Sequence, residues 1–261
     1  MVALRELPGT LELLRGVQRP APVKLLLLPL LVMGNLLLTA EIFHLLSRRF
    51  VRITRLEDLA IVSGLTLANY LPFRPGIFMR IGYFKGRHEV PVGSTVRVLA
   101  EAYGTTVVSV LLLLLFLPLV DAASQGVILA WIAAFTIPVV GLFLDRFRLH
   151  ARVCIIRLFE VLLWAIRLHL AFALIGEPID FTVASGVALA GMSAQMIPFL
   201  GNGLGLREWA TGLLAGLLAG TPLGVALAAE LLIRAAELLV IIPAGIAAAT
   251  WLGRLKVRSG T

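Results

Sequence analysis

The chain has 261 residues, of which 59% are hydrophobic and 15% are charged, and its mean hydropathy is +0.98. This composition excludes an ordinary water-soluble domain and predicts a polytopic, all-α membrane protein. The formal net charge of +8 lies in short clusters between apolar runs, a pattern that excludes nucleic acid as a partner and is typical of topology signals and lipid-headgroup contacts.

The first element in chain order is an amphipathic segment at residues 1–22. Leucine and valine recur there at steps of three or four, and most charges lie elsewhere on the helical wheel. We expect a short helix on the membrane surface, with a loosely ordered tail as the alternative. No cleavable signal sequence is expected, because no small-residue cleavage site follows the first apolar run.

Residues 23–252 are expected to form a single membrane domain. A crossing needs about 20 apolar residues. Runs of about that length occur at 23–46, 95–119, 126–144, 153–175 and 223–252. Two further apolar regions, 56–88 and 182–220, are broken in the middle, so each is interpreted as a re-entrant hairpin of two half-helices, with a full crossing as the alternative. The sequence therefore predicts about five full crossings and six to eight transmembrane segments in all.

Each break is a run of helix-breaking residues followed by a charge. The first reads Leu-Pro-Phe-Arg-Pro-Gly from Leu71 and is followed by Arg80, and the second reads Pro-Phe-Leu-Gly-Asn-Gly-Leu-Gly from Pro198 and is followed by Arg207. Within hydrocarbon, irregular backbone is tolerated only where protein or a water-filled cavity satisfies its polar groups. A pair of breaks therefore predicts a central site.

The two halves also resemble an internal repeat. The matching pairs are Pro72 with Pro198, Arg80 with Arg207, and Glu101 with Glu230. We expect repeat one at about 23–119, a linking helix at 126–144 and repeat two at about 153–252. One connecting span inverts the second copy relative to the first.

Loop charges give a partial topology. The loop at 145–152 and the expected tail at 253–261 are basic, whereas 121–125 and 176–180 carry no Lys or Arg. By the positive-inside rule, the carboxyl terminus is cytoplasmic. The charges of the amino-terminal third leave open the side of the amino terminus and the choice between hairpin and full crossing.

The candidate headgroup-binding residues lie at the two breaks. Arginine can bind a phosphate bidentately, and the freed backbone N–H groups of a helix start add further donors. The alternatives are arginines that reach to the membrane interface and glycines that serve close helix packing. The candidates are Asn69, Arg74, Gly76 and Arg80 at the first break, and Gly201, Asn202, Gly203, Gly205, Arg207 and Glu208 at the second.

Ionisable residues within apolar spans form a second group. Each costs about 2.5–3.5 kcal/mol at mid-membrane, so they should face the bundle interior and pair. They are interpreted as supporting ion pairs or a proton relay, with a structural lattice as the alternative: Glu101, Glu230, Arg234 and Glu237. Glu41 and His44 on the first span are either a protonation pair or a buried hydrogen-bonded pair. No catalytic constellation, metal-ligand spacing or cofactor motif occurs, so we expect neither an enzyme nor a metal or cofactor site.

The order of these elements resembles the transmembrane domain of lysylphosphatidylglycerol synthases and its stand-alone flippase-like relatives. The resemblance covers about residues 25–250 and rests on the segment Asn69–Arg80, Glu101, the segment Pro198–Glu208 and the segment Glu230–Arg234. It implies an inner-membrane, multi-pass protein that handles a lipid in a central cavity. Aminoacylation of phosphatidylglycerol is not expected, because only a short tail follows the membrane domain. The chain departs from the family at Ile77, where a Glu is frequent.

These observations lead to the expectation of a flippase-like lipid translocase for an anionic phospholipid or a polyprenyl-phosphate. The alternative is a non-transporting accessory subunit with a lipid-modifying or glycosyl-transferring enzyme as its partner. The sequence does not specify the lipid, the energy source or the oligomeric state.

Overall fold

The computed structural model describes residues 22–71, 73–117, 124–195 and 205–258. All regular secondary structure in these ranges is α-helical, which confirms the all-α class. The amphipathic segment expected at 1–22 lies outside the described residues except for its last position. Pro72 and Pro198 also lie outside them.

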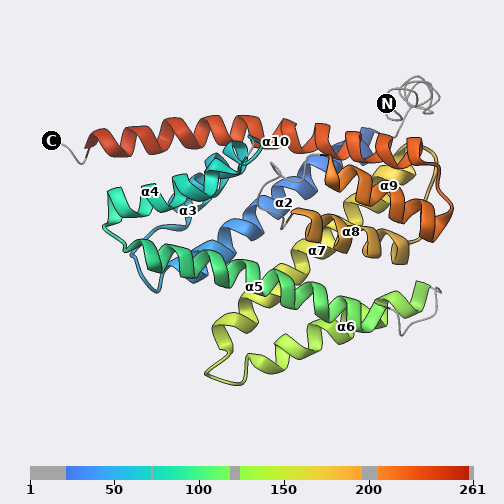
Figure 1. The fold of residues 1–261 in the computed structure, drawn as a ribbon, viewed down its shortest axis with the longest axis horizontal. Helices are drawn as coiled ribbons and strands as arrows, with labels where there is room; N and C mark the ends of the chain where they lie inside the picture. The colour runs from blue at the N-terminus through green and yellow to red at the C-terminus, as the bar shows by residue number, and fades with distance from the viewer. Residues whose placement is uncertain (1–21, 72, 118–123, 196–204, 259–261) are drawn as a thin grey trace.

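The described residues of the first half of the chain form four helices (Figure 1). They are α2 (Pro22–Ser47), α3 (Arg55–Ala68), α4 (Pro75–His88) and α5 (Val92–Phe116). The long spans expected at 23–46 and 95–119 correspond to α2 and α5, and the break expected inside 56–88 separates α3 from α4. The hydroxyl of Thr54 caps α3 by accepting a hydrogen bond from the N–H of Glu57 at 3.2 Å.

The second half follows the same order after one additional helix. Its helices are α6 (Ser124–Gly141), α7 (Arg148–Leu174), α8 (Phe181–Gln195), α9 (Leu206–Ala219) and α10 (Leu223–Arg258). Here too the break lies between two short helices, α8 and α9. The last helix continues into the segment 253–261 that was expected to be a tail.

The α3–α4 pair is a hairpin whose two ends lie at the same end of the molecule (Figure 1). Close to the start of α3, the carboxylate of Glu57 accepts a hydrogen bond from the hydroxyl of Tyr83 at 2.7 Å and lies 2.8 Å from Nε2 of His88, at the end of α4. The chain therefore enters and leaves this region on one side.

The α8–α9 pair has the same form. The two helices pack against each other, and a Cβ atom at Gly186, early in α8, would lie 3.6 Å from the side chain of Leu218, at the end of α9. The residues that connect the two helices, 196–204, are outside the described ranges. The region 182–220 is thus also a hairpin.

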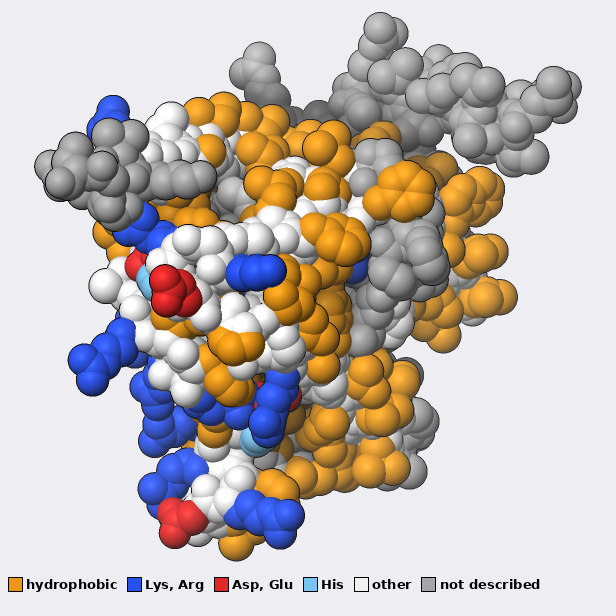
Figure 2. Space-filling model, turned by 60° about the vertical axis from the view of Figure 1, so that its left-hand side comes forward, with side chains coloured by type: hydrophobic (Ala, Val, Ile, Leu, Met, Phe, Trp, Pro, Cys, Tyr) orange, Lys and Arg blue, Asp and Glu red, His pale blue; other side chains and the backbone are white. Residues whose placement is uncertain are grey.

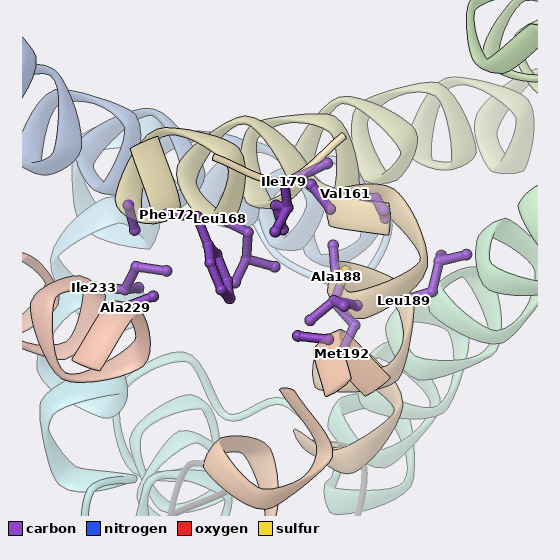
Figure 3. Close-up of a cluster of buried hydrophobic side chains, with 14 of the residues drawn as sticks. Val161, Leu168, Phe172, Ile179, Ala188, Leu189, Met192, Ala229 and Ile233 are labelled. Carbon is purple, nitrogen blue, oxygen red and sulfur yellow. The ribbon is translucent and has the colours of Figure 1, made fainter. Parts of the chain in front are cut away.

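The largest hydrophobic core lies where α7, α8 and α10 meet (Figure 3). Phe172 of α7 and Ala188 of α8 have no exposed surface, and Ile233 of α10 is 3% exposed. Helix α7 also packs against α2, α5 and α6. It is therefore the central helix on which both halves of the chain are assembled.

The outer surface carries many large apolar side chains. Those exposed by half or more include Leu26, Leu30, Leu111, Ile132 and Leu239, on four different helices. Within the described residues, two helical segments, Val23–Ser47 and Val92–Phe116, are long and apolar enough to cross a membrane, and two shorter helices, Gly126–Gly141 and Phe181–Ala194, are also apolar.

Basic side chains gather at one end of the molecule (Figure 2). There, Glu101 of α5 forms ion pairs with Arg49 at the end of α2 and with Arg97 at 3.0 Å, and it lies 3.6 Å from His150 at the start of α7. Leu252 of α10 packs beside the hairpin ends at this same end. We call this region the basic end.

Candidate functional site

The tip of the α3–α4 hairpin is built by residues that oppose a continuous helix. Phe73 and Arg74 have positive φ angles of 62° and 48°, and Pro75 begins α4, where its fixed φ suits a first helical residue. A Cβ atom at Gly76 would lie 2.5 Å from the carbonyl oxygen of Leu65, so only glycine permits this approach of the two helices. The backbone thus turns the Arg74 side chain inward under strain.

Arg74 lines a cavity of about 240 Å³ that the α3–α4 hairpin forms with α2, α5 and α7, and to which α8 adds Met192. The residue is only 6% exposed, and it makes no hydrogen bond or ion pair with any described residue. The side-chain oxygen of Asn69, which lines the same cavity, is likewise buried without a partner. A buried charge without a partner is costly, so this cavity is electrostatically suited to an anion.

Arg80, one and a half turns further along α4, lines the same cavity and is 2% exposed. Its guanidinium donates to Asp58 at 3.4 Å and to Ser47 at 3.2 Å, and it lies 4.0 Å from the ring centroid of Phe43. The aromatic stack and the carboxylate hold its position from α2 and α3. Its Nε remains unpaired.

Arg157 of α7 completes the set of arginines around the cavity. It forms an ion pair with Glu160, whose carboxylate also accepts a hydrogen bond from Thr39. A second cavity of about 140 Å³ adjoins the first and shares four lining residues with it: Thr39, Thr66, Arg157 and Met192. Since Met192 lies near the end of α8, both hairpins contribute to this polar interior.

A network of buried charges borders the second cavity, whose lining includes Arg167 and Glu237. Arg207, 1% exposed, binds Glu230 at 2.8 Å and Glu237 at 3.1 Å and lies 4.9 Å from the ring of Trp164. The network is extended by pairs of Arg167 with Glu237 at 3.2 Å and of Arg234 with Glu208 at 2.8 Å. We call these six charged residues the α9–α10 network.

The α9–α10 network and the lining of the larger cavity differ in net charge. The α9–α10 network contains three arginines and three glutamates. The described lining of the larger cavity contains three arginines and no carboxylate, while Asp58 and Glu160 lie behind two of them. Counted over the described residues, the cavity therefore carries one positive charge in excess, located at Arg74.

The residues expected at the first break come together as a site. Asn69, Arg74, Gly76 and Arg80 all line the larger cavity. At the second break, Gly201, Asn202 and Gly203 lie outside the described residues. Gly205, with a φ of 84°, caps the start of α9, and Arg207 and Glu208 enter the α9–α10 network rather than the described cavity lining.

The residues expected to form supporting ion pairs separate into two places. Glu230, Arg234 and Glu237 all belong to the α9–α10 network. Glu101 also forms ion pairs, but at the basic end, with Arg49 and Arg97. The repeat that matches Glu101 with Glu230 therefore does not give them equivalent surroundings.

Asp58 and Trp164 were not predicted from the sequence as residues of the site. Asp58 is 0% exposed and binds Arg80, and Trp164 lies beneath both Arg167 and Arg207. A signal for Asp58 was available, because an acid within an apolar hairpin requires a buried cation as its partner. Trp164 gives no such signal, since an aromatic residue in an apolar span suits lipid or core equally well.

Together these features define an all-α protein in which the α3–α4 hairpin, α2, α5 and α7 surround an arginine-rich polar cavity. Comparisons with protein-family models, with curated proteins and with solved structures gave no match. Among the described residues, no cluster of His, Cys, Asp and Glu is arranged to hold a metal ion. The cavity and its charged residues are therefore the features of the described structure that bear on function.

Proposed function

We propose that this chain is an integral membrane lipid translocase, related to the flippase-like domains that its sequence resembles. Exposed leucines and isoleucines on α2, α5, α6 and α10 support a lipid-facing surface. Charged side chains of α7 and α10 point instead into the protein, where they pair, as expected for ionisable groups at membrane depth.

In this arrangement α2, α5, α6, α7 and α10 cross the bilayer, and the two hairpins are re-entrant from opposite sides. The basic end then faces the cytoplasm. The carboxyl terminus lies on the cytoplasmic side of a cell inner membrane, and the start of α2 lies on the opposite side. Two inverted halves explain why α2 and α7, each preceding a hairpin, pack on each other.

The single observation that carries the proposal is the buried guanidinium of Arg74, which has no hydrogen-bond or ion-pair partner among the described residues. A phosphate group of an anionic phospholipid or polyprenyl-phosphate would neutralise it bidentately, with Arg80 and Arg157 as further donors around the cavity. The acyl or prenyl chains stay in the bilayer. The described lining offers hydroxyls, an amide and guanidiniums but no carboxylate, thiol or imidazole, so it is equipped for binding rather than for acid–base chemistry.

The test compares lipid translocation by wild-type protein and by Arg74→Gln in liposomes that contain a fluorescent anionic phospholipid. Losing a hydrogen-bonded charge contact costs about 1.5–3 kcal/mol, so the rate should fall roughly 10-fold or more. The matched control is Arg55→Gln, because the side chain of Arg55 is 74% exposed. Equal rates for the wild type and Arg74→Gln refute the proposal.

A further inference from the structure

The cavity is connected to the basic end through a buried carboxylate. Asp58, in the first turn of α3, has no exposed surface. One of its oxygens accepts a hydrogen bond from Arg80 at 3.4 Å, and the other lies 3.1 Å from Nδ1 of His44. The His44 side chain, near the end of α2, is 13% exposed. An imidazole that solvent can reach is therefore linked by one carboxylate to a guanidinium of the cavity.

The neighbouring charges are committed to other partners. On α3 itself, Glu57 is held by contacts from α4, namely Tyr83, Arg87 and His88. On α2, Glu41 pairs with Arg55 at 3.1 Å. Helix α10, which also packs on α3, contributes the apolar Leu252 to the adjoining core. The charged groups that act on Asp58 are thus Arg80, His44 and Glu57.

Protonation of His44 changes how the charge of Asp58 is shared. When the imidazole is neutral, Asp58 offsets the charge of Arg80. When the imidazole is protonated, one carboxylate faces two cations, and the net charge next to the cavity rises by one. Histidine is the side chain whose ordinary titration falls between pH 5 and 8. An anion in the cavity and a proton on His44 therefore stabilise each other, because linkage between two binding events is reciprocal.

We propose that His44 and Asp58 are positioning residues that couple anion binding at Arg80 to uptake of a proton from the cytoplasmic side. The inference rests on the proposed function, because it assumes that the cavity binds an anion. It adds a coupled ion to that function: an anionic headgroup would be taken up together with a proton.

The experiment measures the affinity of purified protein for dihexyl phosphate by calorimetry at pH 8 and at pH 5.5. This phosphodiester does not change its own charge over that range. A coupling of typical size predicts binding about fivefold tighter, or more, at pH 5.5. Repeating the titration in buffers of different ionisation enthalpy reports the uptake of a proton with each anion.

Two histidine variants make the test specific. His44→Gln keeps a hydrogen-bonding side chain beside Asp58 but cannot titrate, so it should bind equally at both pH values. His150→Gln, an exposed histidine beside Glu101, should keep the wild-type pH dependence. Asp58→Asn should bind more tightly than wild type at pH 8 and should also lose the pH dependence.

The outcomes separate the two proposals. If the wild type binds dihexyl phosphate and Arg74→Gln does not, but affinity is the same at both pH values, the coupling is wrong and the anion site stands. Persistence of the full pH dependence in His44→Gln likewise overturns the coupling and leaves the anion site in place. If the wild type binds at neither pH, the anion site and the coupling both fall.

Discussion

Glu237 is the residue whose loss tests the α9–α10 network most directly. Its carboxylate accepts hydrogen bonds at 3.1–3.3 Å from Arg167, Arg207, Arg234 and Tyr70. Glu237→Gln preserves the size of the side chain and removes its charge. The variant leaves three buried arginines facing two glutamates.

Removing one partner from a buried ion pair costs about 3–5 kcal/mol, because an uncompensated charge stays buried. For a chain of this length, each kcal/mol lowers the unfolding midpoint by roughly 2–4 °C. We therefore expect Glu237→Gln to unfold roughly 6 °C or more below the wild type in a thermal scan of detergent-solubilised protein.

The control is Glu41→Gln, whose partner Arg55 is 74% exposed, so its cost should stay within about 1 kcal/mol. The double variant Arg167→Gln/Glu237→Gln restores neutrality. Its destabilisation should be smaller than the sum of the two single effects by about 0.5–3 kcal/mol. Additive effects, or a wild-type midpoint for Glu237→Gln, would refute the reasoning.

Three further outcomes are expected. Gly245→Ala should destabilise the protein by about 1–3 kcal/mol in the same scan, because its Cβ would lie 2.7 Å from the side chain of Leu67, whereas Gly253→Ala, in open space, should not. Phe73→Gly should be about 1 kcal/mol more stable than Phe73→Ala, since a φ of 62° strains any residue with a Cβ; equal midpoints would contradict this. Gly76→Ala should weaken dihexyl phosphate binding about tenfold or more by forcing apart the two helices of the α3–α4 hairpin, and unchanged calorimetric affinity would exclude that role.

The elements of the fold were predictable because their signals are local. Apolar runs marked α2, α5, α6, α7 and α10, and the prolines and glycines at 71–76 and 198–205 marked both breaks. The packing of the two helices that flank each break was not predictable from local signals. It depends on contacts such as that of Glu57 with His88, which join residues far apart in the sequence.

The pairing of charges was the least predictable feature of the candidate site. Glu41 and His44 share a helix face at a spacing of three, which favours a mutual pair. In the structure both turn to α3 instead, where Arg55 binds Glu41 and Asp58 binds His44. A hairpin packed alongside α2 supplies better-placed partners, and helical spacing alone contains no information about it.

The repeat predicts matching arginines, but their electrostatic conditions are opposite. Arg80 and Arg207 each lie in the second helix of a hairpin and each stack on an aromatic ring of the long helix before it, Phe43 or Trp164. Arg207 receives two carboxylates from the unusually long α10, whereas Arg80 receives one, which it shares with His44. Among the described residues, the charges are thus balanced in the second half of the chain and leave an excess positive charge in the first. Under the proposed function, the α3–α4 hairpin then binds the anion, while the charge-balanced α9–α10 network contributes Arg167 and Glu237 to the lining of the adjoining cavity.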